Sequence, residues 1–359
     1  MTLDSTQTTG FVCAHHHLYS TLARGMPAPP RQSEHFTEIL EDIWWRLDAA
    51  LDEQMLYWSA ALGAVEALLV GTTAIVDHHE SPRFIEGSLS VLAKACRDVG
   101  VRLNTSYGVT DRWDDSGNLH SVVEPGSPMT SAARRGLDEC DRYLSSGGEG
   151  MVGLHAAFTC SDETIAAAAQ LAQKHGVGVH IHVAEGPIDK DAAKRLAAFA
   201  TDDWLLVHGV HMDTPLRGRL VHNPRSNMNN AVGYARPSTR ENTILLGTDG
   251  IGSDMLDEAR VAYARLREFD VQATPETVWG WLRNNQALMP ATSRDVVTWN
   301  YDHMDSPWHL AFTTGVRPIR IQVNDDVVLD NGLPTKIDIH EVRAKAAEQS
   351  KRLHERLST

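Results

Sequence analysis

Residues 11–17 read FVCAHHH, a short apolar run that ends in three histidines. Alternate side chains of a β-strand share one face, so we expect His15 and His17 to point into one site and His16 to point away from it. Two imidazoles on one face make up half of a zinc site. The spacing alone also fits a polar turn after a strand, and the rest of the chain has to decide between these interpretations.

Seven further apolar runs of strand type follow, separated by amphipathic stretches such as residues 57–69, 90–99 and 162–175. The runs are Thr73–Val76, Val101–Asn104, Met151–Leu154, Val177–Ile181, Trp204–Val207, Leu220–Val221 and Ile244–Leu246. Strands that alternate with helices indicate a parallel α/β architecture. Eight such units favour a (β/α)₈ TIM-type barrel over a doubly wound sheet, because no Gly-rich phosphate loop follows any run. The short spacing between the sixth and seventh runs predicts that the sixth crossover helix is missing or a single turn.

The pattern changes after residue 295. Residues 319–323 predict a strand, residues 324–326 a turn, residues 327–329 a second strand, and residues 339–357 a polar terminal helix. We therefore expect a barrel domain over residues 1–295, followed by a small β appendage and a closing helix over residues 296–359.

Three more motifs stand at the ends of predicted strands, where barrel enzymes carry their active sites. In HIHVAEG (180–186) one histidine is a candidate metal ligand and Glu185 a candidate proton carrier, although a half-buried strand with satisfied histidines is the alternative. In HGVH (208–211) the preceding apolar run places His208 at the barrel rim. In LGTDG (246–250) Asp249 ends a buried strand, where a carboxylate needs a cation unless it caps a helix.

The bulk composition narrows the function classes. The chain of 359 residues carries a formal charge of −14, which argues against nucleic acid and against an anionic membrane surface as partners. No apolar run approaches the roughly 18–20 residues of a membrane span, and the first residues lack the pattern of a signal peptide. The four cysteines form no C-x-x-C pair, which excludes the cytidine-deaminase type of zinc site and fits a cytoplasmic protein.

Taken in order, these motifs resemble the amidohydrolase superfamily, in its cytosine/guanine deaminase-like branch and closest to aminohydrolases of the SsnA type. The stretches that carry the resemblance are AHHHLYSTLARGMP (14–27), GTTAIVDHHESP (71–82), GLHAAFTCSDET (153–164), HIHVAEG (180–186), HGVH (208–211), VHNPRSNMNNAVG (221–233) and LGTDGIGSDM (246–255). They extend over the predicted barrel.

The resemblance implies one divalent metal ion, zinc by default with iron or manganese as alternatives. Its implied ligands are His15, His17, His182 and Asp249. It implies a homo-oligomer, most simply a dimer. The family usually has about fifty residues before H-x-H that form half of a small β-sandwich, so we expect this half to be absent here. It also usually has a small residue where this chain has His16.

The resemblance also implies roles for residues around the metal. Glu185 and His208 would contact the substrate or transfer protons, and His155 would position the substrate. In the mechanism that we expect, a divalent ion lowers the pKa of water from about 15.7 towards about 7. Asp249 takes the water proton, His208 orients the hydroxide, and Glu185 protonates a ring nitrogen or the leaving group.

Loop residues supply further candidates. One of Trp44 and Trp45 is a candidate to stack on a planar ring, and Arg24 either meets an anionic substrate group or anchors its own loop. Three residues in the loop after the seventh strand are expected to hold the site residues in position by hydrogen bonds. They are Asn223, Ser226 and Asn227.

The expected function is hydrolytic deamination of an amino-substituted purine-, pyrimidine- or triazine-like ring. The same hydroxide would serve ring opening of a cyclic amide or hydrolytic dehalogenation, which is the second hypothesis. The third is a non-catalytic metal-binding scaffold. The set of Glu185, His208 and Asp249 argues against a scaffold, because a scaffold needs no proton carriers beside its metal.

Overall fold

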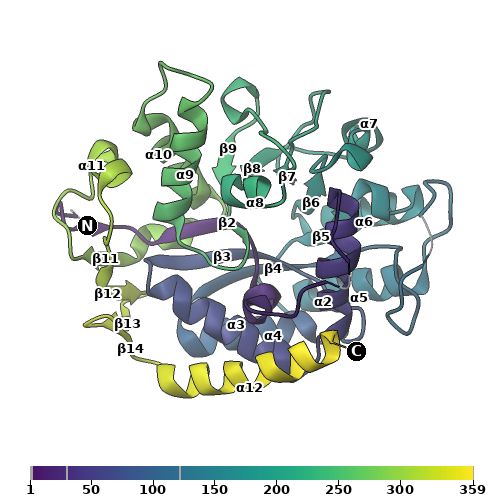
Figure 1. The fold of residues 1–359 in the computed structure, drawn as a ribbon, viewed down its shortest axis with the longest axis horizontal. Coiled ribbons are helices and arrows are strands. Elements are labelled where there is room, and N and C mark those ends of the chain that lie inside the picture. The colour runs from purple at the N-terminus through teal and green to yellow at the C-terminus, as the bar shows by residue number, and fades with distance from the viewer. Residues whose placement is uncertain (1–2, 30, 121–122, 359) are drawn as a thin grey trace.

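The computed structural model describes residues 3–29, 31–120 and 123–358. Its main element is a ring of parallel strands wrapped by helices (Figure 1). In sheet order the strands are β10 (Asp249–Gly250), β2 (Phe11–His17), β3 (Thr72–His79), β4 (Arg102–Val109), β5 (Val152–Ala156), β6 (Val179–Val183), β7 (Leu205–His208), β8 (Arg219–His222) and β9 (Ile244–Leu246). All eight apolar runs predicted from the sequence are strands of this sheet.

The sheet closes because its first and last strands are two parts of one chain segment. Between β9 and β10, the backbone N–H of Gly247 donates to the carbonyl of His222 on β8, and the N–H of Thr248 donates to the carbonyl of His15 on β2. Gly247 is required at this break, because a Cβ here would lie 2.4 Å from the Asn223 side chain. The TIM-type barrel expected from the sequence is confirmed.

The helices outside the ring follow the expected alternation. They are α3 (Glu53–Leu68), α4 (Ser88–Val99), α5 (Ser131–Ser145), α6 (Asp162–His175), α7 (Ala192–Leu196), α8 (Pro224–Asn229), α9 (Met255–Arg267) and α10 (Pro275–Asn284). The described residues 209–218, between β7 and β8, contain no helix, which confirms the prediction of a missing sixth crossover helix. None of the helices in the described ranges has the length and apolar content needed to cross a bilayer.

Apolar side chains fall into two main layers, one on each side of the strands. A large cluster lies between the strands and the helices, and a smaller one fills the inside of the ring. In β2, Cys13 belongs to the outer layer, whereas Val12 and Ala14 belong to the inner one. This division follows from the period of two along a strand.

An extra residue in β2 changes which side chains face the interior. Cys13 pairs with Ile75 and His16 pairs with Asp77, so three steps along β2 match two along β3. Strict alternation after Ala14 would turn His16 inward, but this β-bulge reverses the phase beyond it. The bulge therefore brings His15 and His17 to the interior at the carboxyl end of the strand.

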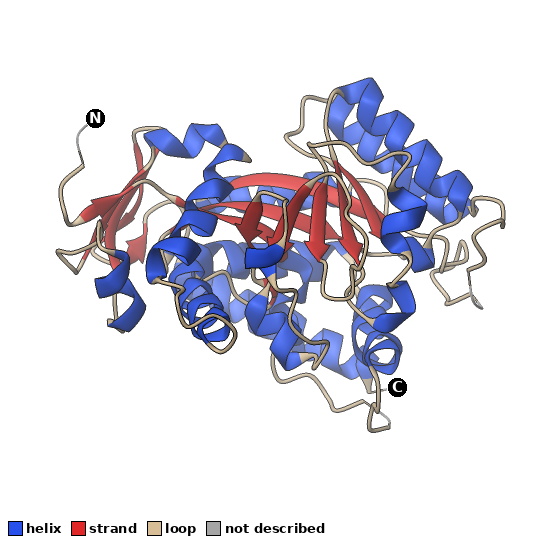
Figure 2. Cartoon of the chain, turned by 90° about the horizontal axis from the view of Figure 1, so that it is seen from above, coloured by secondary structure: helices blue, strands red, loops and turns tan. Residues whose placement is uncertain are grey.

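A second, antiparallel sheet lies at one end of the barrel beside the N-terminus (Figure 2). In order it contains β1 (Gln7–Thr8), β11 (Val296–Trp299), β12 (Pro318–Val323), β13 (Asp326–Asp330) and β14 (Leu333–Pro334). Asn324 and Asp325 both adopt left-handed backbone angles, with φ of 51° and 69°, as a tight hairpin turn between β12 and β13 requires. The predicted appendage hairpin is confirmed, and its sheet also recruits a strand from before the barrel.

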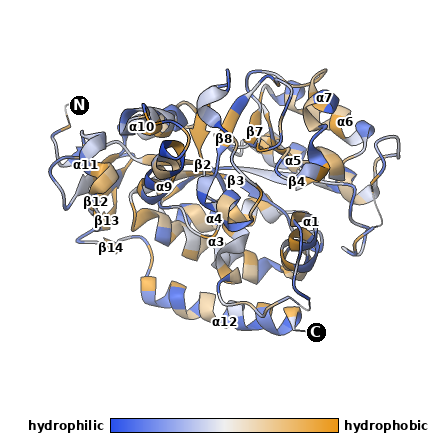
Figure 3. Cartoon of the chain, turned by 45° about the horizontal axis from the view of Figure 1, so that its top comes forward, coloured by the Kyte–Doolittle hydropathy of each residue, from blue (hydrophilic) through white to orange (hydrophobic). Residues whose placement is uncertain are grey.

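The terminal helix α12 (Ile339–Leu357) lies along the outside of the barrel against α3 (Figure 1). It carries both hydrophilic and hydrophobic residues (Figure 3), and Val342 and Leu353 on its inner side are fully buried. Arg352 and Arg356 bond to Asp52 at the start of α3, at 2.8 and 2.6 Å. The closing helix predicted over residues 339–357 thus braces the segment that leads into α3. The domain boundary at residues 295/296 stays a prediction.

Candidate metal centre and pocket

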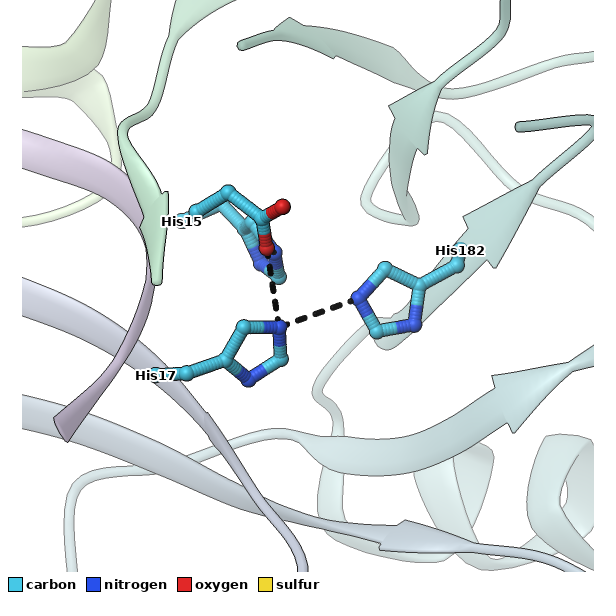
Figure 4. Close-up of side chains that lie close together, drawn as sticks. His15, His17 and His182 are labelled. Atoms are coloured by element: carbon cyan, nitrogen blue, oxygen red, sulfur yellow. Dashed lines mark hydrogen bonds and ion pairs between the residues drawn. The ribbon is translucent and has the colours of Figure 1, made fainter. Parts of the chain in front are cut away.

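Three histidines and one aspartate meet at the carboxyl ends of the barrel strands. His15 and His17 come from β2, His182 from β6, and Asp249 from β10. One donor atom from each lies within 4.8 Å of the other three. Figure 4 shows the rings of His15, His17 and His182 turned toward one another. The structure therefore brings together all four residues to which the resemblance assigned metal ligation.

The donor atoms have spacings that suit a small cation. The Asp249 Oδ1 atom lies 3.1 Å from His15 Nε2 and 3.0 Å from His17 Nε2, and the Nε2 atoms of His17 and His182 are 3.3 Å apart. In a tetrahedral site with ligands at about 2.0–2.1 Å from zinc, neighbouring donors lie about 3.3 Å apart. The arrangement fits one divalent cation.

The second nitrogen of each histidine fixes its orientation. His17 Nδ1 donates to the carbonyl of His78 at 2.6 Å, and His182 Nδ1 donates to the carbonyl of His155 at 2.7 Å. His15 Nδ1 lies 2.8 Å from Nε2 of His180. With Nδ1 engaged in this way, the Nε2 lone pairs are left to face the centre, as metal-binding histidines require.

The centre also stabilises positive charge. Burial disfavours protonation of His17, but the hydrogen bond and charge of Asp249 outweigh this cost and raise the pKa of His17 to about 9. Burial would raise the pKa of Asp249, but the hydrogen bonds from His15 and His17 hold it well below its usual range. His17 and Asp249 therefore favour a positive charge between them, whereas burial lowers the pKa of His15 and of His182.

A pair of side chains lies beside the four donors. His208 on β7 and Glu185 after β6 approach to 3.4 Å between Nε2 and Oε2, and Glu185, His208 and Asp249 form a second close group. His208 Nδ1 lies 2.7 Å from the Asn227 side-chain oxygen, which leaves Nε2 directed to Glu185. Burial lowers the pKa of His208 and, together with the charge of Asp249, raises that of Glu185.

Two residues of the centre have strained backbones. His208 has a φ of 72° and Asp249 a φ of 59°, in the left-handed region that non-glycine residues rarely adopt. Such conformations cost about 1–3 kcal/mol each and persist where the surrounding structure fixes them. The strain turns His208 inward directly after Val207, whose side chain already belongs to the inner apolar layer.

Residues after β8 form hydrogen bonds to side chains of the centre. Ser226 Oγ donates to Asp249 Oδ2 at 2.5 Å, while Asn227 holds His208. The side chain of Asn223 makes no hydrogen bond within the described part of the chain. Where the sequence predicted a loop, the structure has the short helix α8, and Ser226 and Asn227 on this helix make the supporting contacts.

A pocket of about 730 Å³, its open mouth included, leads to the centre. The lining includes His155 and Trp44, two of the residues expected to contact substrate, and also Trp45. Arg24 lies elsewhere: its guanidinium bonds to Glu66 at 2.6 Å, and it is absent from the lining. Of the two roles considered for Arg24, the structure shows the anchoring contact.

The segment after β2 builds one wall of this pocket and was not anticipated in detail. It contains α1 (Phe36–Ile39), the π-helical turn η2 (Leu40–Trp44) and α2 (Trp45–Ala50). Single π turns inside helices are frequent at functional sites. The turn contributes Leu40 and Trp44 to the lining, and the helices on either side contribute Phe36 and Asp48.

Comparisons with known proteins find a matching family and several relatives. The family model described as the amidohydrolase family matches residues 7–279. The 5'-deoxyadenosine deaminase of Methanopyrus kandleri is 30% identical over 296 residues, which cover 74% of this chain and 63% of the relative. The 8-oxoguanine deaminase of Pseudomonas aeruginosa is 28% identical over 315 residues, which cover 78% of this chain and 69% of the relative. The chain thus spans about two thirds of the length of these curated relatives.

Solved structures share the fold at lower identity. The atrazine chlorohydrolase of Arthrobacter aurescens TC1 in complex with zinc superposes with a TM-score of 0.75 at 19% identity, covering 96% of this chain and 88% of that one. An adenosine deaminase of Xanthomonas campestris with bound zinc superposes with a TM-score of 0.76 at 17% identity, covering 97% and 85%.

Proposed function

Because the chain belongs to the amidohydrolase family, we propose that it is a metal-dependent aminohydrolase that releases ammonia from an amino-substituted nitrogen heterocycle. The observation that carries the proposal is the close group of Glu185, His208 and Asp249, in which Glu185 and Asp249 line the pocket together with His17 and His182. A structural metal site has no need of such neighbours. The deaminase names of the two curated relatives support ammonia release over ring opening or dehalogenation.

In this proposal His15, His17, His182 and Asp249 hold one divalent cation, which supplies Lewis acidity and lowers the pKa of a water towards neutrality. We propose zinc, since three imidazoles and one carboxylate are ligands that it commonly takes, while iron or manganese also suit this set. Asp249 accepts the proton of the attacking water through Oδ1 or Oδ2, and the hydrogen bond from Ser226 keeps the carboxylate oriented.

Glu185 and His208 act on the substrate side of the site. Glu185 delivers a proton to a ring nitrogen or to the leaving amine, a role typically worth about 10²–10⁴ in rate. His208 orients the water for attack and stabilises the charge that develops. The hydrogen bond between His208 Nδ1 and Asn227 fixes the orientation of the imidazole and leaves Nε2 for this role. His155 and Trp44 on the pocket wall position the planar ring.

The proposal also includes a homo-oligomer, which family analogy supports, and a cytoplasmic location, which the four cysteines without a C-x-x-C pair support. The decisive test is an ammonia-release screen over amino-substituted purines, pyrimidines and triazines, with metal content measured on the same sample. We expect ammonia in proportion to bound metal for at least one ring class. Products that gain water without releasing ammonia would exclude deamination, and the absence of any product from metal-loaded protein would favour the scaffold hypothesis.

A further inference from the structure

The pocket lining has an unbalanced charge. Its carboxyl groups are Asp48, Glu80, Glu185, Asp189 and Asp249, whereas the lining contains neither lysine nor arginine. Glu185 and Asp249 belong to the reaction centre described above. Asp189 accepts hydrogen bonds from the backbone N–H groups of Phe158 and Ala184, at 3.0 and 2.8 Å. Asp48 and Glu80 remain, and nothing in the proposed reaction uses them.

Asp48 and Glu80 form a buried acidic pair that shares one cation. The Arg112 Nη2 atom lies 3.1 Å from Asp48 Oδ2 and 2.5 Å from Glu80 Oε1, and all three residues are at most 3% exposed. The guanidinium lies between the rings of Trp45 and Trp113, at 4.7 and 5.0 Å from their centroids. One guanidinium can neutralise only one of the two carboxyl groups, so the pair favours a further positive charge, either a proton or a cationic group on a ligand.

Asp48 lines the pocket beside the Tyr19 hydroxyl group. Its Oδ1 atom is buried and makes no hydrogen bond of regular geometry within the described residues, although Tyr19 interacts with the carboxyl group. A buried acceptor without a donor costs about 1–3 kcal/mol, a penalty that a donor on a bound ligand would remove. Tyr19 and His17 are the other titratable groups that act on Asp48. Burial, followed by the charge of Glu80, raises the pKa of Asp48 well above its usual value.

From these contacts and on the premise of the proposed function, we infer that Asp48 and Glu80 select the substrate. The substrate is an amino-heterocycle that is neutral or cationic and presents a hydrogen-bond donor to Asp48, not a phosphorylated or carboxylate-bearing one. Away from the metal centre, an anionic group in this pocket would meet the carboxyl groups of Asp48, Glu80 and Asp189 without a lysine or arginine in the lining. Arg112 does not line this pocket and is already engaged with the acidic pair.

Binding of matched ligands tests the inference separately from turnover. The probes are three rings in their deaminated, oxo form (hypoxanthine, uracil and an oxo-triazine), each carrying either an aminoethyl or a carboxymethyl arm. Affinities are measured by calorimetry on metal-loaded wild type, Asp48→Asn and Glu80→Gln. Glu66→Gln serves as control, because Glu66 pairs with Arg24 outside the pocket. Ammonia release in the screen above reports on the proposed function alone.

We expect at least one ring to bind to wild type about tenfold tighter with the aminoethyl arm than with the carboxymethyl arm. This ratio should fall at least threefold in Asp48→Asn and in Glu80→Gln and stay unchanged in Glu66→Gln. The inference is wrong if the carboxymethyl form binds as tightly, if folded Asp48→Asn and Glu80→Gln keep the wild-type ratio, or if no ring binds in either form. If both variants fail to fold, the ratio of the aminoethyl to the carboxymethyl affinity in the wild type decides whether the inference stands.

Discussion

Replacement of Glu185 by glutamine tests the assignment of the proton carrier. Glutamine has nearly the same shape and can still approach His208, which lies 3.4 Å from Glu185, but it has no proton to transfer. General acid–base groups contribute about 10²–10⁴ in rate, or about 2.7–5.5 kcal/mol of activation free energy. Since the carboxyl is not one of the four metal donors, we expect kcat to fall by this factor while metal content stays at the wild-type value.

The assay is steady-state ammonia release from the best substrate of the screen, with metal content and thermal unfolding measured on the same preparations. Glu66→Gln is the matched control, because it makes the same chemical change outside the pocket. It should retain wild-type kcat. If Glu185→Gln kept more than about a tenth of wild-type kcat with an unchanged pH profile, Glu185 would not be the proton carrier. If it lost the metal as well, Glu185 would be a ligand.

Three further predictions follow from particular contacts. His182→Ala should reduce metal content from about one ion per chain to a small fraction of that, as measured by elemental analysis, because it removes one of the four donors; full occupancy would exclude His182 as a ligand. Ser226→Ala removes the hydrogen bond to Asp249 Oδ2 and should weaken metal affinity about 10–100-fold in a chelator competition; an unchanged affinity would show that this bond does not orient the carboxylate. Burial raises the pKa of Glu258, which bonds to Arg225, from 4.5 to about 7. The native state then binds this proton more tightly than the unfolded chain, so the carboxyl lowers the free energy of unfolding as pH rises from about 4.5 to 7, by at most about 3 kcal/mol. Urea unfolding at several pH values should show a flatter profile for Glu258→Gln than for wild type, and identical slopes would contradict the assignment.

Much of the fold was predictable because its signals are local. Each barrel strand is a short apolar run, and such runs are read from neighbouring residues without knowledge of the rest of the chain. The hairpin at Asn324 and Asp325 and the helix over residues 339–357 were equally local, since turn residues and helical periodicity specify them. The convergence of the carboxyl ends of parallel strands predicted that the candidate motifs meet, and the resemblance to the amidohydrolase superfamily assigned the four metal ligands among them.

The bulge in β2 shows where local rules stop. The spacing in the sequence places His15 and His17 on one face, and strict alternation would put that face opposite to Val12 and Ala14. In the structure all four side chains lie on the interior side of the strand. Only pairing with β3 decides where the extra residue is accommodated, and a shift of one residue reverses every side chain beyond it. The strained backbone of His208 performs the same task on β7.

By itself, the sequence determined the barrel, the appendage hairpin and the terminal helix, since each depends on short-range pattern and strand order. It also carried the motifs whose resemblance to a known family assigned the candidate metal residues. Only the tertiary structure decided the chemistry of the pocket wall. Asp48, Glu80 and Arg112 come from three separate connections, and their shared charge exists only once these connections pack together. Arg24 shows that closeness in sequence is not enough. It lies a few residues after the His15/His17 motif, but in the structure it forms an ion pair with Glu66 outside the pocket. Electrostatic interactions depend on distances in space, which the order of residues along the chain does not fix.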